Sequence, residues 1–132
     1  MNLIVDTSVI IAVITNEKHK QDLIKLSKKT NLIAPTSLHW EIGNAFSAML
    51  KRKRVSIEEA ISALTAYRQI PLQFSEVDLE TALELSSKFN IYAYDAYVIS
   101  CALKHKSPLV TLDEKLLDIA QSAGAAIREV KL

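Results

Sequence analysis

Short apolar runs alternate with longer segments of helical periodicity along the chain. The predicted strands are 3–5 (LIV), 32–34 (LIA), 70–74 (IPLQF), 108–112 (PLVTL) and 125–130 (AAIREV). Between them, the apolar spacing predicts helices over 8–16, 20–29, 37–53, 56–68, 75–89, 94–105 and 114–123. Strands that alternate with helices indicate an α/β fold. We expect a small parallel sheet of four to five strands, flanked by several helices.

Local signals mark where several of these helices begin and end. Ser56 with Glu59 and Thr111 with Glu114 both fit the S/T-x-x-E capping box, which predicts helix starts at those positions. Gly124 is a typical residue for the end of the last helix.

The composition is that of an ordinary globular domain. Of the 132 residues, 49% are hydrophobic and 23% are charged, which argues against disorder and predicts one domain over 1–132. A net charge of +1 favours no class of partner. Two glycines are too few for a GxGxxG motif or a P-loop, which makes a dinucleotide enzyme or a Walker NTPase improbable. The single cysteine, Cys101, lies in an apolar helix, and we expect it in the core.

The N-terminal segment does not resemble a targeting signal. No basic residue precedes its apolar stretch, and Asp6 interrupts that stretch. No apolar run approaches the ~18 residues needed to span a bilayer. We therefore expect a soluble, cytoplasmic protein that makes no membrane contact.

A single carboxylate, Asp95, interrupts the almost wholly apolar stretch IYAYDAYVIS at 91–100. The helix that it opens is apolar on every side, and such a helix is expected to be buried. A buried carboxylate has to be paired, hydrogen-bonded or bound to a metal ion. The sequence must therefore supply a partner for Asp95.

Three further carboxylates are candidates for the same site. Asp6 follows the first predicted strand and Asp113 follows the fourth, so a parallel sheet brings both to one edge. Glu41 lies among apolar residues of a predicted helix. Each also has a purely structural interpretation, because Asp6 and Asp113 are suitable helix N-caps and Glu41 could face solvent.

Clustered together, these four carboxylates would repel one another unless a cation lay between them. Oxygen ligands favour a hard divalent cation, Mg²⁺ or Mn²⁺, and the three histidines and Cys101 lack zinc-ligand spacing. Phosphoryl transfer and phosphodiester hydrolysis are the reactions that suit such a site. We predict an enzyme of this kind.

The stretches LIVDTSVIIA, WEIGNAF and YDAYVISCALKHKSPLVTLDEKL, together with the chain length, resemble PIN-domain ribonucleases. Among these the chain is most similar to the VapC-type toxins of toxin–antitoxin pairs. The resemblance covers the whole chain and implies a Mg²⁺- or Mn²⁺-dependent endoribonuclease, inhibited by a VapB-like antitoxin and assembled as a homodimer. The family's acidic quartet matches Asp6, Glu41, Asp95 and Asp113. Its supporting polar positions match Thr7, Ser8, Asn44 and Thr111.

Other residues bear on where RNA would lie. Lys51, Arg52, Lys53 and Arg54 form the one dense basic run, which either contacts phosphates or solvates a helix end. Trp40 and Tyr94 lie beside Glu41 and Asp95 and are interpreted as packing residues, with base stacking as the alternative.

Two other functions are compatible with the acidic residues. A Mg²⁺-dependent phosphatase would carry a DxD pair after the first strand, where this chain has DTS. A non-catalytic PIN-like module that binds RNA or protein would have lost part of the quartet, which is complete here.

Overall fold

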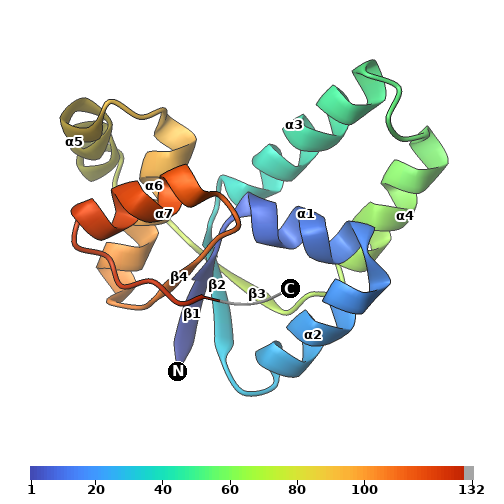
Figure 1. Cartoon of the computed structure of the whole chain (residues 1–132), viewed down its shortest axis with the longest axis horizontal. Helices are drawn as coiled ribbons and strands as arrows, with labels where there is room; N and C mark the ends of the chain where they lie inside the picture. The colour runs from blue at the N-terminus through green and yellow to red at the C-terminus, as the bar shows by residue number, and fades with distance from the viewer. Residues whose placement is uncertain (130–132) are drawn as a thin grey trace.

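The computed structural model describes residues 1–129, apart from the side chain of Glu17, and confirms the α/β fold (Figure 1). The elements are β1 (Asn2–Val5), α1 (Thr7–Thr15), α2 (Glu17–Ser27), β2 (Asn31–Pro35), α3 (Leu38–Lys51), α4 (Ile57–Tyr67), β3 (Leu72–Ser75), α5 (Leu79–Phe89), α6 (Ala93–His105), β4 (Leu109–Val110) and α7 (Glu114–Ser122). The strands pair in parallel in the order β3-β2-β1-β4.

Most predicted elements are confirmed, and two are wrong in part. The helix predicted over 75–89 begins only at Leu79, because residues 72–75 form β3. Of the strand predicted over 125–130, only Ile127 pairs, through an isolated parallel bridge to Leu109; residue 130 lies outside the described residues. The neighbouring β4 is two residues long, so it offers little edge for a further strand.

The capping signals have mixed outcomes. The capping box of Ser56 and Glu59 is present at the start of α4. The one predicted at Thr111 is wrong, because Asp113 is the N-cap of α7. Gly124 follows the end of α7 with φ +92°, a conformation that glycine adopts without strain.

The sheet separates two hydrophobic cores. Successive residues of β1 point to opposite faces, so that Leu3 and Val5 pack with α1–α4 while Ile4 packs with α6 and α7. Figure 1 shows the same division, with α1–α4 on one face and α5–α7 on the other. No helix within residues 1–129 is long and apolar enough to cross a bilayer.

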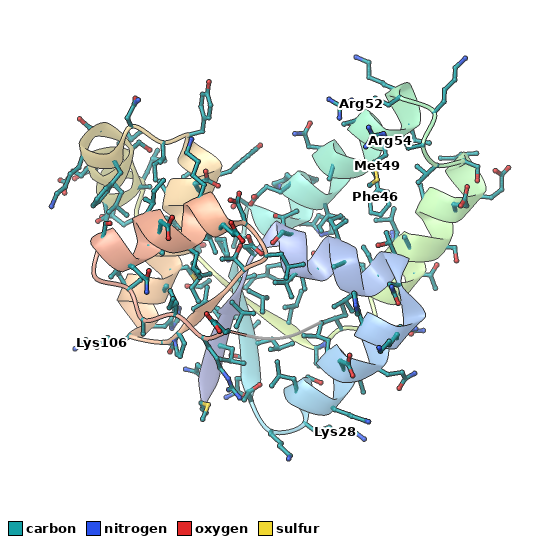
Figure 2. All side chains as sticks on the ribbon, viewed as in Figure 1. Lys28, Phe46, Met49, Arg52, Arg54 and Lys106 are labelled. Atoms are coloured by element: carbon teal, nitrogen blue, oxygen red, sulfur yellow. The ribbon has the colours of Figure 1, made fainter. Side chains whose placement is uncertain are left out.

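Helices α3 and α4 form an arm that projects beyond the sheet (Figure 1). Figure 2 shows Arg52 and Arg54 at the outer end of this arm, beyond Phe46 and Met49. Lys51, Arg52, Lys53 and Arg54 are all exposed there. The basic run thus lies at the far end of the helix whose first turn carries Glu41.

Candidate active site

The carboxyl ends of the parallel strands form one edge of the sheet, and the candidate residues gather there. After β3 the chain crosses past β2 and β1 to form β4, so the strand order reverses between β1 and β4. In open α/β sheets, ligands bind beyond the strand ends at such a reversal. Asp6 directly follows β1, and Thr111 directly follows β4.

Asp6 is buried and held by three hydrogen bonds. Its Oδ2 accepts from Thr111 Oγ1 at 2.5 Å, and its Oδ1 accepts from Ser8 Oγ at 2.7 Å. Oδ1 also accepts from the backbone N–H of Val9 at 3.2 Å, which makes Asp6 the N-cap of α1. Capping and membership of the acidic site are therefore compatible at this residue.

The hydroxyls that orient Asp6 also fix the segment after β4. Ser8 Oγ accepts from the backbone N–H of Leu112 at 3.0 Å, and Thr111 Oγ1 accepts from that of Asp113 at 3.0 Å. Each hydroxyl donates to Asp6 and accepts from this segment. Together they join residues that are more than one hundred positions apart in the sequence.

Glu41 lies in the first turn of α3 and is half-buried. Its Oε1 accepts from Thr7 Oγ1 at 3.0 Å, and its Oε2 accepts from Ser37 Oγ at 2.8 Å. Ser37 occupies the N-cap position of α3 without capping it through its side chain, because the hydroxyl binds Glu41 instead. The sequence analysis missed Ser37; its position four residues before Glu41, one helical turn away, is the signal that would have found it.

The remaining two carboxylates are less constrained. Asp95, in the first turn of α6, was predicted to be buried but is only half-buried. The start of this helix faces solvent, where the preceding Tyr92 is 88% exposed. Asp113 is exposed and caps α7 by accepting from the N–H of Leu116 at 3.1 Å. Its structural interpretation as an N-cap is thus confirmed, without excluding a second role.

The acidic residues act on one another electrostatically. Burial raises the pKa of Asp6, an effect that Thr111 and Ser8 partly offset and the charge of Asp113 reinforces. Burial also raises the pKa of Glu41, and the charges of Asp6 and Asp95 raise it further. The pKa of Asp95 is raised by burial and then by Asp113 and Asp6, against a smaller opposing effect of Lys115.

Carboxylates from four separate segments are thus close enough for the charge of one to raise the pKa of another. Within residues 1–129, however, no three His, Cys, Asp or Glu side chains converge into a ready-made set of metal ligands. The tight four-carboxylate cluster expected from the sequence is therefore absent as a preformed cage. The oxygen-only, mutually repelling set fits a hard, hydrated cation such as Mg²⁺, which is commonly bound by one or two carboxylates and several waters.

The supporting residues divide into two groups. Thr7, Ser8 and Thr111 all donate to a carboxylate of the site. Asn44 is exposed on α3, one turn beyond Glu41.

The aromatic residues and Cys101 have different outcomes. Trp40 is 71% exposed, so its interpretation as a packing residue is wrong. Tyr94 is 46% exposed and contacts the ring of Tyr97 edge-on at 6.0 Å. Cys101 is confirmed as a core residue, and burial raises the pKa of its thiol to about 11.

The fold and site define an α/β protein with an acidic centre at the reversal of its strand order. The family model of the PIN domain matches residues 3–122. The chain therefore belongs to the PIN domain family. Members of this family generally depend on a divalent metal ion.

Solved structures with the same fold are distant in sequence. PAE2754 from Pyrobaculum aerophilum superposes with a TM-score of 0.70 at 22% identity, covering 98% of this chain and 92% of that one. VapBC2 from Rickettsia felis, bound to a DNA fragment from its promoter, has a TM-score of 0.71 at 17% identity and covers 98% of both chains. VapC20 from Mycobacterium tuberculosis, a toxin that cleaves the sarcin–ricin loop, has a TM-score of 0.60 at 15% identity, covering 94% and 96%. A comparison with curated protein sequences finds no match.

Proposed function

We propose that this protein is a Mg²⁺- or Mn²⁺-dependent endoribonuclease, the toxin of a VapBC-type toxin–antitoxin pair. The observation that carries this proposal is the gathering of Asp6, Glu41, Asp95 and Asp113 at the carboxyl edge of the sheet, where the pKa of each of the first three is raised by burial and by the charge of at least one other member. The same fold in VapC20, a toxin that cleaves the sarcin–ricin loop, supports it.

Within this proposal, the acidic quartet holds the cation. When bound, the cation supplies an activated water and stabilises the charge that develops on the phosphate. Thr111 and Ser8 keep both oxygens of Asp6 directed into the site. Asp95 and Asp113 complete the set from the starts of α6 and α7, which cover the other face of the sheet from α1 and α3.

Glu41 and Asp113 are the two candidates for the general base, and Glu41 is the better one. A base works best when its pKa is close to the pH of the reaction, and the pKa of Glu41 is raised by burial and by its acidic neighbours. Thr7 and Ser37 orient its carboxylate, so a water molecule beside it would meet a fixed acceptor.

The proposal includes partners. Lys51, Arg52, Lys53 and Arg54 would contact phosphates of the RNA away from the acidic site. A VapB-like antitoxin is proposed as the inhibitor, supported by the likeness to the VapBC2 chain. We further propose that the protein forms a homodimer and acts in the cytoplasm.

The test is RNA cleavage by the purified protein with Mg²⁺ or Mn²⁺, compared with the same protein in EDTA. We expect Asp6→Asn to lower kcat at least about 100-fold while circular dichroism shows a folded protein. The matched control is Asp118→Asn, which changes an exposed aspartate of α7 outside the quartet and should leave cleavage unchanged.

Cleavage in EDTA by folded Asp6→Asn protein would contradict the proposal. Failure of the wild type to cut any RNA with either metal, while it still binds RNA, would favour the non-catalytic PIN-like module. Release of phosphate from small monoesters without RNA cleavage would favour the phosphatase.

A further inference from the structure

A hollow lies on the same edge of the sheet as the acidic site. It has a volume of about 260 Å³ and is lined by Thr36, Ser37, Trp40, Val77, Leu79 and Tyr97. Thr36 follows the end of β2, and Val77 lies just beyond the end of β3. Asp6 and Asp113 of the acidic site follow β1 and β4, whereas the hollow lies beyond the ends of β2 and β3.

One residue, Ser37, belongs both to the hollow and to the acidic site. Ser37 lines the hollow and donates its hydroxyl to Glu41 at 2.8 Å. Trp40 directly precedes Glu41 on α3. A molecule seated in the hollow is thus separated from the Glu41 carboxylate by one side chain, that of Ser37.

The lining has the chemistry of a site for a flat, uncharged group. It contains two aromatic side chains, two aliphatic side chains and three hydroxyls, one of them on Tyr97, with no charged side chain. Within a nucleotide, the phosphate finds no cationic side chain in this lining, whereas the base carries no charge and stacks on aromatic rings. The volume lies just below the ~300–1,000 Å³ typical of sites for drug-sized ligands, which suits a single base.

We propose that this hollow, which we call the Trp40 pocket, binds one unpaired base of the RNA beside the phosphate that is cleaved. The proposal rests on the ribonuclease function proposed above and names the form of RNA that the site takes, a single strand whose bases are free to unstack. Trp40 is 71% exposed. The His39 ring packs edge-on against the indole, with 5.1 Å between the ring centroids, so one contact supports the indole while most of its surface stays accessible.

Trp40 is the only tryptophan in the chain, so its fluorescence reports on the pocket directly. With Mg²⁺ present and cleavage prevented by Asp6→Asn, a short single-stranded oligoribonucleotide of random sequence should quench this emission in a saturable way. The same RNA in a duplex, and a strand of equal length without bases, should leave the emission unchanged. Anisotropy of a labelled strand measures RNA binding independently of Trp40.

Kinetics provide the second measurement. We expect Trp40→Ala to raise KM about 5- to 150-fold with little change in kcat, the range that corresponds to the loss of one stacked base. Trp40→Phe keeps a ring and should recover most of the affinity. The control is Ile61→Ala on α4, which truncates another exposed apolar side chain and should leave KM unchanged.

Three results would overturn the Trp40 pocket while leaving the nuclease in place. These are cleavage and an anisotropy change without quenching, equal quenching by the strand without bases, and an unchanged KM in Trp40→Ala. A fourth is protection of Trp40 from acrylamide that depends on protein concentration without RNA, because a second copy of the chain would then cover the pocket. Conversely, quenching by single strands without cleavage of any RNA would overturn the nuclease and leave the pocket.

Discussion

The acidic site consists of two pairs of carboxylates that are held very differently. Asp6 and Glu41 each accept hydrogen bonds from two side-chain hydroxyls, one on each oxygen. Asp113 accepts a backbone N–H as a cap and lies exposed, and Asp95 is half-buried in a helix turn that faces solvent. The first pair is held on both oxygens before any ligand arrives, and the second pair is held less tightly. We infer that Asp6 and Glu41 set the geometry and that Asp95 and Asp113 adapt to it.

The largest effect is expected at the hydroxyl that serves both pairs. Thr111→Val removes the donor to Asp6 and the acceptor of the Asp113 N–H. Leaving an oxygen of the buried Asp6 carboxylate without its hydrogen-bond donor costs about 1–3 kcal/mol of stability. The free energy of unfolding measured by urea denaturation should fall by that amount. We also expect kcat to fall about 10- to 100-fold, since Asp6 would no longer be oriented.

Thr111→Ser restores the hydroxyl and serves as the control, with stability and activity close to wild type. Full activity in Thr111→Val would show that the fixed pair does not depend on its hydroxyls.

A smaller effect is expected at Glu41, which is less buried. Thr7→Val removes one of its two hydroxyl donors. That hydrogen bond lowers the pKa of Glu41, so its loss raises the pKa further. Because a general base acts when deprotonated, the acidic limb of the pH profile of kcat/KM should move to higher pH, with about a 10-fold loss of activity on that limb.

Recovery at alkaline pH separates this titration effect from misfolding. A uniform loss at every pH, or no shift of the acidic limb, would argue against Glu41 as the base.

The smallest effect is expected at Asp95, and it is a gain of stability on mutation rather than a loss. The pKa of Asp95 in the folded protein is raised above its ordinary value of 3.8 by burial, Asp113 and Asp6. Ionisation therefore costs folding free energy, a cost that is absent below that value and grows as the pH rises through the raised pKa. Without metal at pH 7, Asp95→Asn should be more stable than wild type by about 0.5 kcal/mol, a small figure because the group is half-exposed.

Thermal melts across pH check this sign, because the difference should vanish near pH 3. Added Mg²⁺ should then stabilise the wild type more than Asp95→Asn. A variant that is less stable than wild type at pH 7 without metal would show that Asp95 is also fixed by the fold.

The contrast between the two pairs also explains what the sequence could predict. Alternating apolar runs predicted the sheet, and the predicted strand ends correctly placed Asp6 and Asp113 at one edge of it. The donation from Ser37 to Glu41 was missed because it depends on how α3 begins, which periodicity does not encode. The same limit applies to Trp40, because a tryptophan between His39 and Glu41 in a predicted helix has the same sequence pattern whether it is buried or, as here, 71% exposed.

The predicted metal cluster differs from the structure for a related reason. The order of strands brings the carboxylates to one edge, and strand order follows from general rules of α/β folds. Their separation there depends on the caps and turns after each strand. Asp113, for example, is directed partly by its role at the start of α7. Sequence patterns therefore predicted the neighbourhood but not the spacing.

The hydrogen bond between Thr111 and Asp6 joins residues 105 positions apart, so the site depends on a contact between distant parts of the sequence. Domains are synthesised from the N-terminus, and their early segments become available for folding first. A nascent chain still missing its last strand would carry Asp6 without the threonine that orients it. Under the proposed nuclease function, a growing polypeptide is therefore expected to be inactive on the ribosome, and cleavage should appear only once synthesis has passed β4.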